Sequence, residues 1–154
     1  MASILYRYEQ PMKKYIILTS LALLSLASCR KKDETVDPEV SAHIGNYVFY
    51  SSGKMVTAKR EASVPSGPVS IEGLMSNGAT LRLWIRSYVE KPGILNLDST
   101  DAAATYLPPT PSIEVRSVRG VLNITQVTPV VTGTYFFVCT DSTAVNGSFK
   151  INPL

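Results

Sequence analysis

The stretch that decides the fold is residues 69–85, which read VSIEGLMSNGATLRLWI. Apolar and polar side chains alternate on both sides of a central Ser76-Asn77-Gly78 segment. This period of two is typical of strands with one buried face, and the Asn-Gly pair marks a tight turn between them. The stretch therefore predicts an antiparallel hairpin.

The length of the turn follows from which residues must face the core. A two-residue turn would place Glu72 opposite Leu83, on the buried face. A three-residue turn with Gly78 in the left-handed conformation pairs Ile71 with Leu83 instead, and it sets Glu72 opposite Arg82 on the outer face. We predict the three-residue turn because both faces then agree.

The chain from Ala42 onward shows the same alternation, interrupted by turn signals rich in Gly, Pro and Asn. We expect strands at 43–50, 54–61, 68–75, 79–88, 93–97, 103–107, 112–118, 120–127, 133–140 and 144–151. Their short connections imply antiparallel pairing, because parallel strands need crossovers of about a dozen residues. The sequence thus predicts an all-β domain over 42–154, an antiparallel β-sandwich of about 8–10 short strands, with a small closed β-barrel as the alternative.

Residues 1–28 contain the three parts of a secretory signal. Lys13 and Lys14 precede an apolar run at 15–26, and small residues follow the run. The run is shorter than the roughly 20 residues that a transmembrane helix needs, although a signal-anchor helix stays as the alternative. Met12 is the better initiator, which makes residues 1–11 an upstream extension.

The segment Leu26-Ala27-Ser28-Cys29 resembles the bacterial lipobox. The resemblance implies cleavage before Cys29, a diacylglycerol on its thiol and acylation of its new amine, and two or three chains anchor a protein firmly. Residues 29–41 are expected to form a flexible, charged tether. Within it, Lys32-Asp33-Glu34 resembles the surface-export signal of Bacteroidota lipoproteins, with a plain solvated linker as the alternative. We expect a lipid-anchored protein of the cell envelope at the outer membrane, facing either the periplasm or the cell surface.

The charge balance excludes one class of partner. The 154 residues include 15 basic and 12 acidic ones. Loss of residues 1–28 lowers the net charge from +3 to about +1, so nothing favours a nucleic acid as partner. Once Cys29 is lipidated, Cys139 has no partner in the chain, and we expect it to be a small buried apolar residue.

The C-terminal third carries the best family resemblance. Its segments are Gly120-x-x-x-Ile124-Thr125, then Thr132-Gly133-Thr134-Tyr135-Phe136-Phe137, then Asn146-Gly147-x-Phe149. This order is similar to an uncharacterised family of short Bacteroidota lipoproteins, and the resemblance covers most of residues 42–154. It implies a fold and an envelope location only, because no enzymatic activity comes with the family. Tyr135 stands where the family usually has Phe, and residues 42–50 match its first strands poorly.

The same alternation separates two faces in this region. Tyr135, Phe137 and Cys139 fall on one face, which we expect to be the core. Phe136 and Val138 fall on the opposite face, which is either solvent-exposed or a contact surface.

We predict no catalytic residue, no metal site and no cofactor. The sequence contains none of the common nucleophile, zinc or phosphate-loop motifs. His43 is the sole imidazole, and Asp98 and Asp101 lack the Gly-centred loop of a calcium site. A spatial pair of carboxylates stays open, because sequence does not show one.

Two sets of residues are candidate surface sites. Arg82, Trp84 and Arg86 alternate outward on one expected strand, where an aromatic ring beside cations can stack on a sugar or dock a partner chain. The alternative is that a loop or second layer covers Trp84. Ser99 and Ser142 each follow an Asp and precede a Thr, which resembles the O-glycosylation motif of Bacteroidota proteins.

Three function classes follow from these observations. The leading one is a membrane-anchored envelope lipoprotein whose non-enzymatic β-domain binds a glycan, a peptide or an envelope protein. The second is a structural accessory subunit of an outer-membrane assembly that uses an exposed apolar face. A hydrolase has the least support.

Overall fold

The computed structural model describes residues 35–154, except 62–66, 88, 99 and 111–112. The expected signal segment and Cys29 therefore lie outside the described residues, as does the tether up to residue 34. The described chain contains ten strands and one short 3-10 turn. They are β1 (Glu39–Ile44), β2 (Tyr47–Ser52), η1 (Gly53–Met55), β3 (Val56–Arg60), β4 (Val69–Leu74), β5 (Thr80–Ile85), β6 (Gly93–Asn96), β7 (Ala102–Leu107), β8 (Val115–Gln126), β9 (Val131–Cys139) and β10 (Ala144–Ile151).

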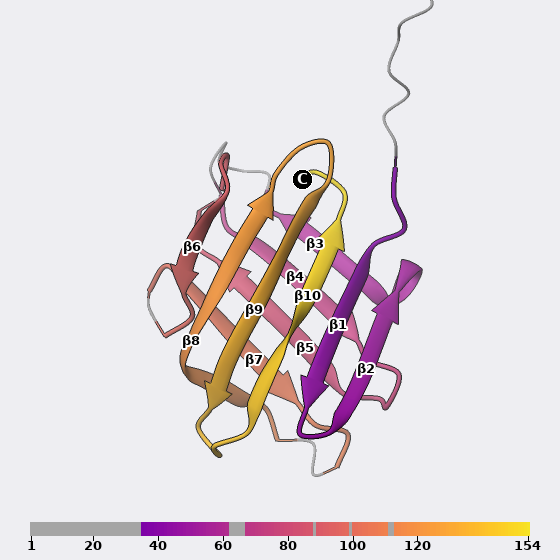
Figure 1. Ribbon diagram of the computed structural model, residues 1–154, viewed down its shortest axis with the longest axis vertical. Coiled ribbons are helices and arrows are strands. Elements are labelled where there is room, and N and C mark those ends of the chain that lie inside the picture. Colours follow the sequence, from indigo (N-terminus) through magenta and orange to yellow (C-terminus); the bar gives the residue numbers. More distant parts are fainter. Residues whose placement is uncertain (1–34, 62–66, 88, 99, 111–112) are drawn as a thin grey trace, which may run out of the picture. The chain divides into compact units, whose positions relative to one another are not determined.

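All the strands belong to one antiparallel sheet, which confirms the predicted fold class. Their order is β2-β1-β10-β9-β8-β7-β5-β4-β3, and β6 pairs with β8 beside this path. The sheet folds into two layers, with β6, β8, β9, β10, β1 and β2 in front of β3, β4, β5 and β7 in Figure 1. The Ser76 backbone N–H donates to the Tyr50 carbonyl at 2.9 Å, so the two ends of the sheet meet at one point. The domain is thus a two-layered sheet that nearly closes into a barrel.

Strand β8 connects the layers. Val115 and Arg116 at its start pair with β7, while the rest of the strand pairs with β9 after a register shift beyond Ser117. Ser117 is buried at this corner, where its hydroxyl donates to the Leu97 carbonyl and accepts from the Ala104 N–H at 3.0 Å. One side chain therefore joins three segments where the sheet changes layer.

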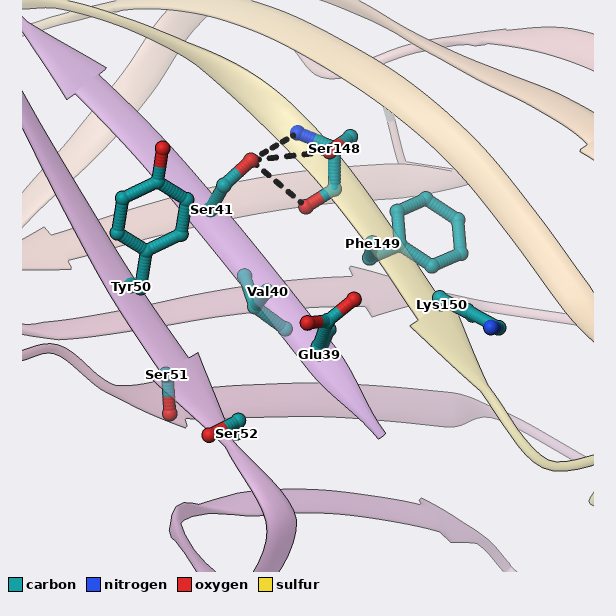
Figure 2. A pocket seen from close by; sticks show the side chains of 9 residues that line it. All are labelled: Glu39, Val40, Ser41, Tyr50, Ser51, Ser52, Ser148, Phe149 and Lys150. Atoms are coloured by element: carbon teal, nitrogen blue, oxygen red, sulfur yellow. Dashed lines mark hydrogen bonds between the residues drawn. The ribbon is translucent and has the colours of Figure 1, made fainter. Parts of the chain in front are cut away.

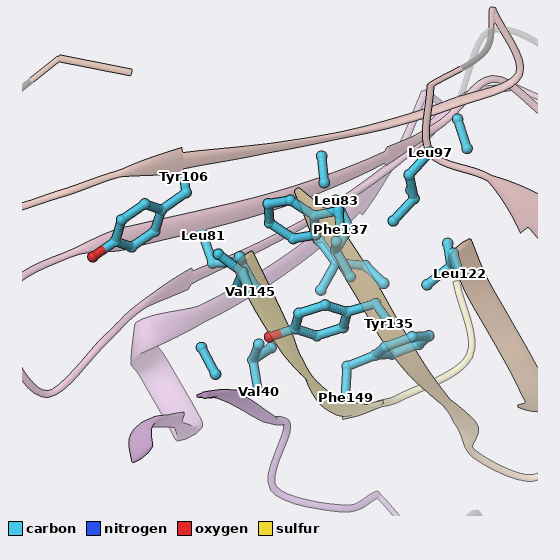
Figure 3. Packing of buried hydrophobic residues seen from close by; sticks show 14 of the residues in the cluster. Val40, Leu81, Leu83, Leu97, Tyr106, Leu122, Tyr135, Phe137, Val145 and Phe149 are labelled. Carbon is cyan, nitrogen blue, oxygen red and sulfur yellow. The ribbon is translucent and has the colours of Figure 1, made fainter. Parts of the chain in front are cut away.

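The hydrophobic core lies between the two layers (Figure 3). Leu83 from the back layer and Leu122 and Phe137 from the front layer are fully buried. The rings of Tyr135 and Phe137 lie 6.0 Å apart and tilted, a geometry that aromatic pairs favour. Each such side chain contributes about 1.5–3 kcal/mol when it leaves water.

The hairpin at residues 69–85 has the predicted register. Ile71 stands opposite Leu83, and Glu72 stands opposite Arg82. Gly78 has φ +84°, the left-handed conformation that the three-residue turn requires. The Arg82 guanidinium lies 2.7 Å from the Glu72 carboxylate, so the cross-strand ion pair is confirmed as well.

Two expected strand boundaries are wrong. Residues 43–50 form a hairpin instead of one strand, because Gly45 turns the chain at φ +60° between β1 and β2. Residues 112–118 and 120–127 were expected as two strands, but β8 runs through Gly120 without a turn. A Cβ at Gly120 would lie 2.6 Å from the Phe137 Cβ, so this glycine serves close packing against β9.

The N-terminal end of the described domain is fastened to its C-terminal end. β1 begins at Glu39, within the segment expected as tether. Before it, the Val36 N–H donates to the Asn152 side-chain oxygen at 2.9 Å, and the Asn152 amide donates to the Val36 carbonyl at 3.0 Å. This pair of bonds, the Val36–Asn152 clasp, extends the ordered domain to residues that the sequence pattern did not include.

Candidate functional site

The first candidate site is the outer face of the back layer, called here the Trp84 surface. Lys59, Ser70, Trp84 and Ala103 stand side by side across β3, β4, β5 and β7. Trp84 is half-buried and points away from the core, and its two direct neighbours have short side chains. A hollow of about 320 Å³ lies beside it, lined by Lys59, Arg60, Glu61, Pro68, Val69, Ser70 and Trp84. Trp84 therefore presents part of its surface to this hollow.

The two arginines predicted beside Trp84 have different surroundings. Arg82 is exposed on the same strand, where its guanidinium lies 2.7 Å from Glu72 and 3.6 Å from Glu114. The sheet's own carboxylates thus neutralise it. Arg86 is exposed just beyond the end of β5, and its backbone N–H donates to the Asp101 carbonyl at 2.8 Å. Of the predicted set, Trp84 lines the hollow of about 320 Å³.

The second candidate site is the outer face of the front layer. A single row of polar side chains crosses five strands there, because the residues are direct partners in the registers of the strand pairs. The row, called here the hydroxyl row, consists of Tyr50, Ser41, Ser148, Thr134 and Asn123, from β2, β1, β10, β9 and β8 in that order.

Hydrogen bonds hold the centre of the row in place (Figure 2). The hydroxyl oxygens of Ser41 and Ser148 lie 2.9 Å apart, and the Ser148 N–H donates to the Ser41 hydroxyl at 3.1 Å. From the core side, the Tyr135 phenol donates to the Ser41 carbonyl. Burial raises the pKa of the Tyr135 phenol, so it stays a protonated donor. Hydrogen bonds on the outer face and one from the core side thus fix the position of Ser41 and Ser148.

Gly147 makes this arrangement possible. A Cβ at this position would collide with the Ser41 carbonyl oxygen and lie 2.6 Å from the Tyr135 phenol oxygen. The missing side chain therefore lets Tyr135 reach β1 beneath the row. The Tyr135 hydroxyl therefore has a structural role, since a Phe at this position could not donate the bond.

Two hollows adjoin along the hydroxyl row. The first, of about 420 Å³, lies over β10, β1 and β2 and is lined by Tyr50, Ser41 and Ser148 among others (Figure 2). The second, of about 540 Å³, lies over β8, β9 and β10 and includes Asn123 and Thr134. Their lining residues come closest in the row where Ser148, at the first hollow, stands opposite Thr134, at the second.

Exposed apolar side chains border the second hollow. Phe136 is 46% exposed and Val121 is 42% exposed, and they stand opposite each other on β9 and β8. Phe136 thus lies on the outer face, as the alternation predicted. Val118 is 51% exposed on β8. The sequence signalled Phe136, but the row beside it was missed because its members come from five separate strands.

The remaining candidates are isolated. His43 is exposed on β1 opposite Asn146, and among the described residues no three His, Cys, Asp or Glu side chains gather as a metal site would require. Cys139 is buried, as predicted, and burial raises the pKa of its thiol to about 11, with the Asp141 charge adding to the effect.

The two predicted glycosylation sites differ in what the structure describes. Ser142 is exposed at the tip of the β9–β10 turn, where the Asp141 side chain accepts a bond from the Thr143 N–H at 2.9 Å. Ser99 lies outside the described residues.

Comparison of the chain with protein-family models, with curated proteins and with solved structures gave no match in any of the three. In the part of the chain that the structure describes, no helix has the length and apolar character needed to cross a membrane. The two outer faces and the N-terminal sequence are therefore the features of the chain that bear on its function.

Proposed function

We propose that the chain is a lipoprotein held in the cell envelope by lipids on Cys29, and that its β-domain binds a glycan, a peptide or another envelope protein without transforming it. The location is supported by the signal segment, the lipobox and the resemblance to short Bacteroidota lipoproteins. The outer membrane is the proposed site of anchoring.

The observation that carries the binding role is the presence of exposed aromatic rings on an outward sheet face. Tyr50 and Phe136 both lie on the outer face of the front layer, and each borders a hollow. Their burial would stabilise a purely structural domain more than their exposure does. Aromatic rings are enriched where proteins contact partners, because they supply large contact areas at low entropic cost.

Anchoring is tested by metabolic labelling with palmitate in a bacterium that processes lipoproteins. We expect label on the wild-type chain and on Cys139→Ser, and no label on Cys29→Ser. Cell fractionation should place the first two in the membrane fraction. Equal labelling of all three chains, or a wild-type chain free in the cytosol, would contradict the proposal.

A structural accessory subunit is the second candidate function. It is favoured by Val121 and Phe136, which stand opposite each other and expose apolar surface on the outer face of the front layer. Val118 adds exposed apolar surface on β8. Mild crosslinking in intact cells followed by purification tests this function. A stoichiometric envelope partner that is lost in Val118→Ser/Val121→Ser but kept in Trp84→Ala would establish this role.

A further inference from the structure

We propose that the hydroxyl row is the binding site of a neutral oligosaccharide, which lies across the strands from Tyr50 to Asn123. The inference rests on the proposed binding function and names its ligand class and its site. It differs from the expectation of a sugar on Trp84, which lies on the other layer.

The first argument is the chemistry of the row. Three aliphatic hydroxyls, one phenol and one carboxamide stand in line across five strands. Hydroxyl and amide groups both donate and accept hydrogen bonds. The hydroxyl groups along the edges of a sugar chain also donate and accept hydrogen bonds. The donors and acceptors of the row can therefore pair with those of the sugar, and no charged group is needed on either side.

The second argument is the charge of the row. The row contains no acidic or basic side chain. Its members are Ser, Thr, Tyr and Asn residues. In the adjacent row, Glu39 and Lys150 stand directly opposite each other and offset one another. An anionic ligand such as a phosphate chain needs several cations along its path, and this row has none. A neutral ligand is the one that leaves no charge uncompensated on binding.

The third argument is the placement of aromatic rings. Tyr50 is 64% exposed at the first hollow, and Phe136 is 46% exposed at the second. A sugar ring has an apolar C–H face that packs on an aromatic ring, while its hydroxyls point to polar neighbours. Tyr50 and Phe136 are three strand spacings apart across the sheet, or about 14 Å, and Phe136 also lies two residues along β9 from Thr134, which adds to the distance. A single sugar cannot reach both rings, so the ligand is an oligosaccharide of several units.

The fourth argument is rigidity. The Ser41–Ser148 contacts and the Tyr135 bond to the Ser41 carbonyl fix the centre of the row before any ligand arrives. A preformed site loses little conformational entropy on binding. This favours recognition of a flexible sugar chain, whose own ordering already opposes association.

The test uses the mature chain, residues 29–154, with Cys29→Ser to keep it in solution. Every described strand lies within 39–151, so this chain retains the whole sheet. The probes are soluble neutral polysaccharides of the glucan, mannan and xylan types, with polygalacturonate and a sulfated polysaccharide as anionic counterparts. Binding is measured by retardation in native gels that contain each polysaccharide, and then by calorimetry with oligosaccharides of two to six units.

The variants are chosen in matched pairs. Tyr50→Ala removes an aromatic ring from the row, whereas Tyr47→Ala removes a 70% exposed ring whose position alternates to the other face of the same strand. Phe136→Ala is paired with Trp84→Ala on the opposite layer. Thr134→Val removes a hydroxyl while keeping the side-chain shape. Because these side chains are not fully buried, circular dichroism should show an unchanged fold in every variant.

We expect retardation by at least one neutral polysaccharide, with affinity that rises from two to six units. Tyr50→Ala and Phe136→Ala should each weaken binding about tenfold, and Thr134→Val by several-fold. Tyr47→Ala and Trp84→Ala should bind like the parent chain. Binding only to anionic probes, no neutral binding at all, or a loss confined to Trp84→Ala would each overturn the inference. A loss of binding confined to Trp84→Ala would still be consistent with the broader binding function. Lipid anchoring at Cys29 is tested independently by the palmitate labelling.

Discussion

Replacement of Gly147 by Ala should destabilise the domain more than any other single added methyl group on the front layer. The new Cβ would collide with the Ser41 carbonyl oxygen and lie 2.6 Å from the Tyr135 phenol oxygen. The first neighbour is backbone, and the second is held by its bond to that backbone. Relief therefore requires β1 to move away from β10, and a side-chain rotation does not suffice.

The magnitude follows from two losses. Overpacking of a tight site costs about 1–3 kcal/mol. Loss of the buried Tyr135 bond to Ser41 costs about 1–3 kcal/mol more. Against this, replacing Gly by Ala restricts the unfolded chain and stabilises by about 0.4–1 kcal/mol. We expect the free energy of unfolding to fall by about 1–5.5 kcal/mol for Gly147→Ala.

The assay is urea unfolding of residues 29–154 with Cys29→Ser, followed by the fluorescence of Trp84, the sole tryptophan. Gly93→Ala is the control, because a Cβ there meets nothing within 4 Å. It should change stability by less than about 1 kcal/mol. Tyr135→Phe isolates the hydrogen bond and should cost about 1–3 kcal/mol. If Gly147→Ala stays within about 0.5 kcal/mol of the parent with an unchanged denaturant slope, the close approach of β1 and β10 is refuted.

Three further predictions concern other parts of the domain. Ser117→Ala should lower the free energy of unfolding by about 1–3 kcal/mol in urea titrations, since two buried backbone groups lose their hydrogen-bond partner. A decrease below about 0.3 kcal/mol would be too small for a side chain that holds these two groups. Arg82→Ala should change the free energy of unfolding by less than about 1 kcal/mol, because the ion pairs of Arg82 are solvent-exposed. A larger decrease would contradict the small contribution expected of these ion pairs. The raised pKa of Cys139 means that the folded state holds its proton longer than the unfolded chain. Stability should therefore fall as pH rises from about 9 to about 11, with a smaller fall in Cys139→Ala, and equal slopes would oppose a buried neutral thiol.

The sequence predicts this fold well wherever one face is clearly buried. Alternation and turn chemistry suffice for the register of the hairpin at residues 69–85, because a one-residue slip would bury Glu72. At Gly45 the prediction fails although a signal is present, because Gly45-Asn46 is a two-residue hairpin turn. The apolar residues on both sides of this pair resemble one continuous strand. The prediction fails again at Gly120, where glycine serves a close approach between strands, a role that its identity alone does not distinguish from a turn.

The candidate site is less predictable for a physical reason. Trp84 and Phe136 stand out locally, since a large aromatic ring at an outward position is conspicuous in an alternating strand. The hydroxyl row has no local signature, because Ser41 and Ser148 are 107 residues apart in the chain. Only the strand order brings them together, and that order depends on pairing between distant segments.

The Val36–Asn152 clasp determines how the domain responds to tension applied at its N-terminal end. Since β1 starts where β10 ends, a pull at Thr35 loads the two clasp bonds first and then the rungs between β1 and β10 one after another. Unzipping of this kind proceeds at low force, and its third rung contains Ser41 and Ser148. A force on a ligand bound to the outer face would thus separate Ser41 from Ser148 and weaken the binding of that ligand before the core unfolds.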